Sequence, residues 1–150
     1  MIDKVIMNDD IKPPLIAHVI HQLGMGGLEN GLINLINRMP ADSFRHVIIC
    51  MTDATNFSER LNKAVEIYPL HKKEGKDLWV YFKLWKLFRK IKPDIVHTRN
   101  LSALEAQLAA ALAGVPIQIH GEHGRDVHDL DGSNKRYQLI RKFFRIMIDR

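Results

Sequence analysis

The sequence has few of the features that mark secreted, membrane-spanning or repetitive proteins. Its 150 residues include a single cysteine, Cys50, so no disulfide can form within the chain, which fits a reducing compartment. Cys50 lies in the apolar run 47–51, where we expect it to be a small core residue. No apolar run is long enough to span a bilayer, and neither a cleavable secretion signal nor an internal repeat is found. These absences predict a globular, cytoplasmic protein.

The residues that are present suffice for one domain with its own core. The chain is 46% hydrophobic and 26% charged, as in ordinary globular proteins. Its formal net charge is +5, with basic residues gathered in segments 79–92 and 135–150. Such segments indicate an anionic partner, which can be nucleic acid, lipid head groups or a phosphorylated substrate, or else two solvated helix faces. Because neither segment holds a recognisable nucleic-acid-reading motif, we expect no nucleic-acid partner.

Short apolar runs alternate with helical patterns along the chain. After a polar leader over residues 1–14, the predicted strands cover residues 15–21, 44–51, 66–69, 94–97 and 116–120. The predicted helices cover residues 28–39, a short turn from 56, and residues 77–91, 102–113 and 133–148. Nearly continuous apolar strands that alternate with helices indicate a parallel sheet covered on both faces. With right-handed crossovers, the pattern predicts an α/β, Rossmann-like three-layer sandwich with strand order 3-2-1-4-5.

Polar residues at the predicted helix starts are candidate N-caps. Asn56 and Asp77 each precede a helical pattern. Ser102, followed by Glu105, has the spacing of a capping box for the alanine-rich helix. Capping explains Ser102 without a catalytic role.

The basic helix 77–91 carries two apolar stripes. One consists of Leu78, Phe82, Trp85 and Phe88, and the other of Val80, Leu84, Leu87 and Ile91. We expect one stripe to pack on the sheet, which leaves the other for a membrane surface, with Lys83, Lys86 and Lys90 near anionic head groups. A wholly structural helix is the alternative.

Ligands of such sheets bind beyond the carboxyl ends of the strands, where the strand order reverses. The loops after the first, fourth and fifth strands should therefore converge. In the first loop, Gly24, Gly26 and Gly27 open directly onto a helix, so free backbone amides favour a phosphate there. A tight turn without a ligand is the alternative. The third glycine of the dinucleotide fingerprint falls on Glu29, which disfavours an NAD site.

The other two loops are rich in residues that exchange protons or bind anions. They contain His97, Arg99, His120, Glu122, His123, Arg125 and Asp126. A histidine can exchange a proton with a sugar hydroxyl near neutral pH, although each of these histidines can equally be structural. We expect His18, within the first strand, to be a core residue. The spacing of His120 and His123 lacks the helical pairing of a common metal site, so no metal is expected.

Three segments resemble the N-terminal domain of GT-B-fold glycosyltransferases of family 4. Residues 16–20 run into Gly26-Gly27-Leu28-Glu29-Asn30, which is similar to that family's G-G-x-E loop and helix. Residues 94–100 and 117–124 resemble its fourth and fifth strands. The segment 120–126 is most similar to sugar transferases of bacterial exopolysaccharide clusters, including those associated with exosortase systems. The resemblance covers residues 15–150.

The resemblance implies one half of a GT-B fold and a retaining hexosyltransferase with no metal or other cofactor. Its donor would be a nucleotide-diphosphate sugar and its acceptor a glycan or lipid-linked molecule, in exopolysaccharide biosynthesis. The loop 24–27 would face the donor diphosphate. His123 and His97 are the expected catalytic residues, and the expected acceptor- or anion-binding residues are Arg99, Glu122, Arg125 and Asp126. His123 would position groups and stabilise charge rather than form a covalent bond. Peripheral contact with the inner face of the plasma membrane is also expected.

In that family a second Rossmann-like domain holds most of the nucleotide sugar. Residues 15–150 then correspond to the acceptor-side domain, truncated, and the donor-binding domain is absent from the sequence. We therefore expect the chain alone to be inactive. Two other interpretations stay open. One is a nucleotide-binding oxidoreductase or epimerase domain with Asp53 as the ribose carboxylate, and the other is a non-catalytic nucleotide-binding module.

Overall fold

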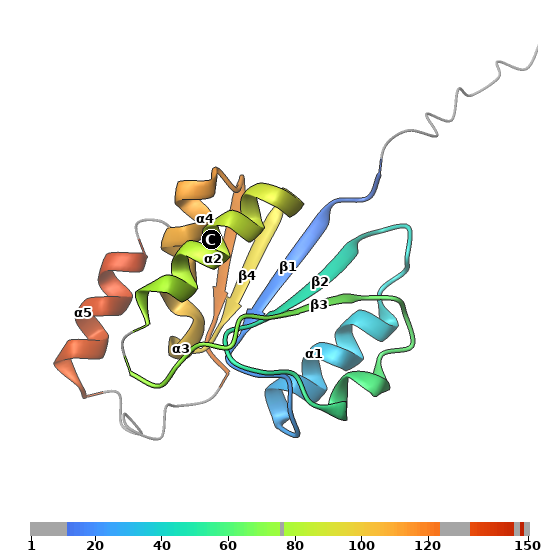
Figure 1. Cartoon of the computed structure of the whole chain (residues 1–150), viewed down its shortest axis with the longest axis horizontal. Helices are drawn as coiled ribbons and strands as arrows, with labels where there is room; N and C mark the ends of the chain where they lie inside the picture. The colour runs from blue at the N-terminus through green and yellow to red at the C-terminus, as the bar shows by residue number, and fades with distance from the viewer. Residues whose placement is uncertain (1–11, 76, 124–132, 146–147, 149–150) are drawn as a thin grey trace, which may run out of the picture.

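The computed structural model describes residues 12–75, 77–123, 133–145 and 148, and it shows one sheet between two layers of helices (Figure 1). The strands are β1 (Leu15–Ile20), β2 (Arg45–Cys50), β3 (Glu66–Pro69), β4 (Ile95–Arg99) and β5 (Ile117–Gly121). The helices are α1 (Gly27–Arg38), the 3-10 helix η1 (Asn56–Arg60), α2 (Leu78–Ile91), α3 (Leu101–Leu104), α4 (Ala106–Ala113) and α5 (Lys135–Phe144). Residues 1–11 of the expected leader lie outside the described residues.

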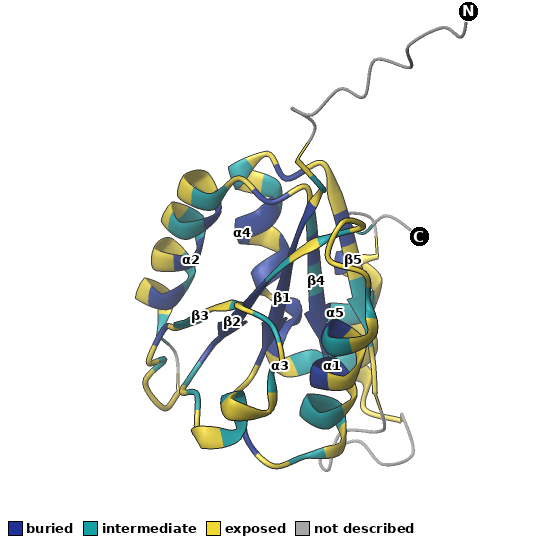
Figure 2. Ribbon diagram, turned by 90° about the vertical axis from the view of Figure 1, so that its right-hand side faces the viewer, coloured by how far each residue is buried: buried dark blue, intermediate teal, exposed yellow. Residues whose placement is uncertain are grey.

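All neighbouring strands of the sheet are parallel, and their order is β3-β2-β1-β4-β5. This confirms the predicted α/β sandwich and its strand order. All six residues of β1 are buried, because β1 lies at the centre of the sheet with helices on both faces (Figure 2). The order reverses between β1 and β4, so the carboxyl ends of these two strands mark the expected ligand-binding edge.

Each face of the sheet has its own core. On one face, apolar residues of β1, β2 and β4 pack against Val80, Leu84 and Phe88 of α2 and the buried alanines of α3 and α4. On the other face, residues of β1 and β2 pack against the buried side of α1, and Phe57 of η1 joins them. His18 is 1% exposed and Cys50 is fully buried, so both are the core residues that the sequence predicts.

The structure corrects two of the predicted helix starts. Asp77 caps α2 by accepting a hydrogen bond from the amide of Trp79, as expected. Thr55, rather than Asn56, caps η1. The capping box of Ser102 and Glu105 is wrong, because β4 continues to Arg99 and a helix begins directly at Leu101. Ser102 therefore lies within α3.

Glu105 separates α3 from α4 and accepts a hydrogen bond from the hydroxyl of Tyr81 on α2. Its side chain thus joins two helices instead of capping one. At the last helix, Asn134 is the N-cap and its side chain accepts from the amide of Arg136, one residue later than the predicted start.

Of the two stripes on α2, the one with Val80 and Leu84 packs on the sheet. Phe88, which the sequence placed on the other stripe, is buried with them, so that assignment was wrong. Leu78 and Phe82 remain 77% and 47% exposed. Only part of the second stripe is therefore available to a partner.

Candidate active site

The carboxyl ends of β1, β4 and β5 present their polar side chains on two opposite faces. Side chains alternate between the faces along a strand. Val96 packs in the core beneath α2 and α4, so His97 and Arg99 point to the face that carries α1. His18 of β1 and His46 of β2 lie on that same face, and the imidazole rings of His18 and His97 are 6.0 Å apart.

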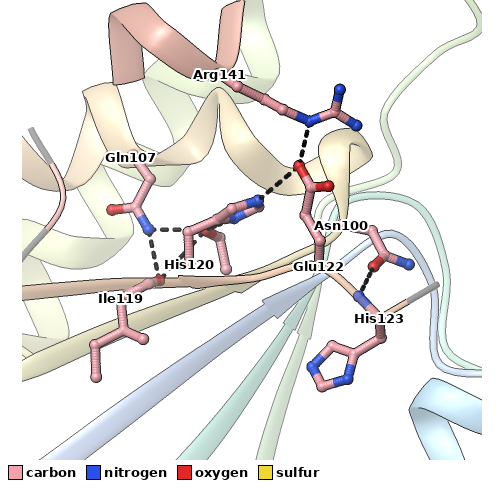
Figure 3. Close-up of polar contacts among 8 residues, drawn as sticks. Asn100, Gln107, Ile119, His120, Glu122, His123 and Arg141 are labelled. Carbon is pink, nitrogen blue, oxygen red and sulfur yellow. Dashed lines mark hydrogen bonds and ion pairs between the residues drawn. The ribbon is translucent and has the colours of Figure 1, made fainter. Parts of the chain in front are cut away.

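His97 and His123 meet at the end of β5. A Cβ atom placed at Gly121 would lie 3.2 Å from the Nε2 atom of each imidazole, so the missing side chain leaves room for both rings. The backbone amide of His123 donates a hydrogen bond to Oδ1 of Asn100 over 2.7 Å (Figure 3). The structure therefore brings together the two histidines that the sequence proposed as catalytic.

Asn100 is a positioning residue that the sequence analysis missed. It stands between β4 and α3 with φ of 60° and ψ of 164°, a conformation that few residues other than glycine adopt. Asparagine tolerates positive φ better than most side chains. Its amide oxygen holds the chain at His123, so a strained residue of one loop fixes the geometry of the other.

Arg99 is the most deeply buried charged residue near this edge, at 4% exposure. Its Nη2 atom lies 3.4 Å from Nδ1 of His97, and its Nη1 atom has no hydrogen-bond partner among the described residues. Burial lowers the pKa of the guanidinium to about 10, so it remains charged at neutral pH.

The imidazoles of His97 and His18 are held neutral. Burial, together with the positive charge of Arg99, lowers the pKa of His97 to about 4. Burial also lowers the pKa of His18 well below its ordinary value, with Arg99 as the second cause. His18 stacks on His46 with ring centroids 5.3 Å apart, and Nε2 of His18 lies 3.1 Å from Nδ1 of His46.

His120 does not join this group, because it faces α4 (Figure 3). Buried Gln107 of α4 donates hydrogen bonds of 2.7 Å to the Thr98 hydroxyl and to a carbonyl oxygen of β5. The Thr98 hydroxyl lies 2.8 Å from Nδ1 of His120, within hydrogen-bond distance. Desolvation lowers the pKa of His120. His120 is therefore tied into the structure between β4, β5 and α4.

Glu122 points the opposite way from His123 (Figure 3). Its Oε1 atom accepts a hydrogen bond of 2.7 Å from Nε of Arg141 on α5 and lies 3.8 Å from Nε2 of His120. The carboxylate thus links β5 to α5. No sequence pattern indicates this pairing, since Arg141 is one of several basic residues in segment 135–150.

The glycine loop begins α1 without a side-chain cap. Gly26 is the N-cap residue, and as a glycine it has no side chain that could accept a hydrogen bond from the first turn. The loop is anchored through Leu23, which bonds to the backbone of Asp53 and Thr55 over 3.1 and 2.9 Å. A Cβ atom at Gly26 would collide with the carboxylate of Glu29, so this carboxylate lies against the loop and does not point away from it.

The remaining predicted residues fall into three groups. Arg125 and Asp126 lie outside the described residues. Lys83, Lys86 and Lys90 are exposed on α2, and Nζ of Lys86 stands 5.6 Å from the centroid of a phenylalanine ring on the same helix. Asp53, the ribose carboxylate of the alternative interpretation, contacts Nδ1 of a histidine after β3 at 2.6 Å.

No group of three or more histidine, cysteine, aspartate or glutamate side chains is placed to hold a metal ion within the described ranges. In the same part of the chain, no helix is both long and apolar enough to cross a membrane.

Two comparisons of sequence match this chain to glycosyltransferases. The sequence profile of Glycosyltransferase Family 4 matches residues 25–150. The chain is 30% identical over 114 residues to the Escherichia coli enzyme UDP-Gal:alpha-D-GlcNAc-diphosphoundecaprenol alpha-1,3-galactosyltransferase, a match that covers 73% of this chain and 30% of that protein. The chain thus spans less than a third of the length of this curated relative.

Solved structures share the fold at low sequence identity. A UDP-N-acetylglucosamine 2-epimerase is similar with a TM-score of 0.62 and 18% identity, over 92% of this chain and 41% of that one. A glycosyltransferase from Rickettsia africae is similar with a TM-score of 0.56 and 18% identity, over 93% of this chain and 41% of that one. At such identities the likeness establishes the Rossmann-like fold of this chain.

Proposed function

Since the chain belongs to glycosyltransferase family 4, we propose that it forms one wall of the active site of a retaining hexosyltransferase. The donor is a nucleotide-diphosphate sugar, and no metal or other cofactor is needed. The acceptor is a glycan or a lipid-linked molecule of exopolysaccharide biosynthesis, handled at the cytoplasmic face of the plasma membrane. The Escherichia coli relative, whose name gives a UDP-sugar donor and a lipid diphosphate acceptor, supports this assignment.

The observation that carries the proposal is the meeting of His97 and His123 over Gly121 at the strand ends. His123 is exposed, so its imidazole is accessible to a sugar, where it positions groups and stabilises charge. His97 is neutral at physiological pH because of burial and Arg99, and it orients the acceptor by hydrogen bonding. In this proposal neither histidine forms a covalent intermediate.

The donor diphosphate lies on Gly24, Gly26 and Gly27, whose helix start has no side-chain cap. Glu29 lies against the same loop, and its carboxylate repels a phosphate unless it hydrogen-bonds a neutral hydroxyl of the sugar. In this proposal most of the nucleotide is held by a second domain, as the resemblance to GT-B-fold enzymes implies. We expect Arg125 and Asp126 to act on the acceptor side with Arg99, whereas Glu122, which bonds to Arg141 on the opposite face, is left out of this group.

Thermal unfolding of the chain with added nucleotides tests the donor site. UDP or GDP should raise the midpoint temperature, and NAD should not. A response to NAD alone would favour the oxidoreductase or epimerase alternative, and no response to UDP or GDP would contradict a donor site here. Turnover of a UDP-sugar by residues 1–150 alone would contradict the need for a second domain.

Membrane contact through α2 is a second proposal, supported by an apolar groove of about 800 Å³ between α2, α4 and α5. Trp79 beside it is 72% exposed, and Leu112 of α4 is 69% exposed. The exposed Lys83, Lys86 and Lys90 of α2 supply the charge that attracts anionic head groups. An amphipathic surface of this kind lies in the interface without crossing the bilayer.

Flotation with anionic vesicles tests the membrane contact. The chain should float at low salt, and the variant K83Q/K86Q/K90Q should not. The matched control K12Q/R38Q/R60Q removes the same number of positive charges outside α2 and should float like the parent. Equal loss of flotation in both variants would mean that binding depends on net charge and not on α2. Absence of binding by the parent at low salt would contradict the proposal.

A further inference from the structure

We propose that the buried guanidinium of Arg99, with the imidazoles of His97 and His123, forms a receptor for a phosphate group of a substrate. The inference deepens the proposed function and rests on it only in naming the phosphate as part of a sugar donor or acceptor. It gives the carboxyl ends of β4 and β5 a chemical role that is separate from that of the glycine loop.

The first observation is a buried positive charge that has no counter-charge among the described residues. Arg99 is 4% exposed, and within the described parts of the chain no carboxylate contacts it. Its Nη1 atom is buried and has no hydrogen-bond partner there. Buried charges in proteins are normally paired, because the free energy of hydration that an ion loses on burial is then offset by the attraction of an opposite charge. An anionic ligand would supply the missing partner.

The second observation is that the neighbours of Arg99 on this face are imidazoles. Arg99 acts on both His18 and His97, and its charge is the second cause of the lowered pKa of each. Because the rings of His18 and His97 are neutral, the guanidinium of Arg99 is the positive charge among these three side chains. The imidazoles also supply N–H donors that match phosphate oxygens.

The third observation concerns the direction of those donors. Nδ1 of His97 faces Nη2 of Arg99 at 3.4 Å and can only accept from it, so the proton of the neutral ring belongs on Nε2. That Nε2 atom lies over Gly121, beside Nε2 of His123. A phosphate at this place would receive one donor from each histidine and have the guanidinium behind it.

The absence of a side chain at Gly121 completes the site. A Cβ atom there would stand 3.2 Å from each Nε2, which is closer than most Cβ contacts, so a side chain would displace the two rings. The glycine has no conformational need of its own, since its φ is not in the left-handed region. We therefore assign to it the role of keeping the receptor open.

Calorimetry with inorganic pyrophosphate at pH 7 tests the receptor in the chain as it is. The variant R99Q removes the charge, R99K keeps the charge without the planar fork, and R89Q removes an exposed charge of α2 as a matched control. We expect R99Q to weaken binding at least tenfold, R99K to weaken it less, and R89Q to change it less than twofold. Absence of binding in the parent, or equal binding in R99Q, would overturn the proposal.

A measurement on the unsubstituted chain covers the case in which R99Q does not fold. An anion beside His97 favours the protonated ring, so saturating pyrophosphate should raise the pKa of His97, followed by NMR of the ring nitrogens. A phosphate bound elsewhere would leave that titration unchanged, and this result also counts against the receptor.

Two further probes identify the source of the phosphate. UDP represents the donor, and a short-chain alkyl sugar diphosphate represents a lipid-linked acceptor. The probe whose binding depends on Arg99 names the source. Failure of the proposed function is seen separately, because Arg99-dependent binding of pyrophosphate, with no binding of UDP or of the sugar diphosphate, would retain the receptor and reject the transferase assignment.

Discussion

The Nε2 atoms of His97 and His123 each lie 3.2 Å from the point that a Cβ atom would occupy at Gly121. His97 lies within β4 and His123 follows β5, and the register of β4 against β5 brings the two rings together. In that register Arg99 stands opposite Gly121.

The first prediction is that Gly121→Ala impairs sugar transfer without unfolding the protein. The added methyl group displaces both rings by a few tenths of an ångström, and such errors at a reacting centre cost on the order of tenfold or more in rate. The free energy of unfolding should change by less than about 1 kcal/mol. Transfer rates, measured on a protein in which this chain is joined to its donor-binding domain, and denaturant unfolding of the chain measure the two effects.

Gly31→Ala is the control for this prediction. Gly31 lies in α1, and nothing stands within 4 Å of an added Cβ atom. This substitution should leave transfer unchanged and stabilise α1 by roughly 0.5–1 kcal/mol. Equal transfer rates of G121A and G31A would show that the positions of His97 and His123 do not matter for the reaction.

The second prediction concerns the contact between Gly26 and Glu29. Gly26→Ala pushes the carboxylate away from the start of α1 and should cost about 0.3–1 kcal/mol, the value of an acidic group at a helix N-terminus. In the double variant G26A/E29A the carboxylate is already gone, so the methyl group should cost little. A double-mutant cycle in denaturant gives the coupling. Additive effects of the two substitutions would contradict the contact.

The third prediction is that the folded state loses stability between pH 6.5 and about 4. Burial lowers the pKa of His97 to about 4, and it also lowers the pKa of His18. Within this range the unfolded chain binds more protons than the folded one, so stability falls as the pH falls. For partly exposed His97 we expect a loss of roughly 1 kcal/mol after solvent screening.

Unfolding midpoints measured at pH 7, 6 and 5 follow this loss. His18→Leu removes a fully buried imidazole and should flatten the pH profile. The exposed His21 gives the control His21→Leu, whose profile should match the parent. A profile that is flat in the parent chain would show that the buried imidazoles do not titrate as described.

The fourth prediction is that Asp94→Ala destabilises the sheet. Oδ2 of Asp94 accepts a hydrogen bond of 2.7 Å from the amide of Leu15, at the start of β1. Its backbone also bonds to Leu15 and to the amide of Ile117, at the start of β5. Loss of the carboxylate leaves a buried residue's amide unpaired and should cost about 1–3 kcal/mol.

Asp42→Ala is the control for this prediction, because Asp42 is exposed, and it should change stability by less than about 0.5 kcal/mol. Guanidinium unfolding distinguishes the two variants. Equal midpoints would mean that water replaces the carboxylate at no cost.

Most of the fold could be predicted because its cause is local. Strands such as β1 are nearly continuous apolar runs, and the handedness of crossovers leaves few strand orders. The errors arose where local patterns compete. Ser102 and Glu105 have the spacing of a capping box, but the helix begins before them at Leu101, and only the length of β4 decides this.

The site was predictable only as a set of converging loops. Its division into two faces depends on the alternation of side chains at the strand ends. His97 and His120 each come after a short apolar run in the sequence, but their side chains lie on opposite faces of the sheet. Gln107 and Arg141 look like ordinary helix residues in the sequence, and their partners become visible only when helices and strands are packed together.

The bond between Asn100 and the amide of His123 has a consequence for how relatives can differ. Position 100 must adopt a positive φ and also offer an acceptor atom, and glycine meets only the first need. Asparagine and aspartate meet both. We therefore expect divergence in this family to spare position 100, or to change it together with the loop that carries His123, so that the two segments evolve as one unit.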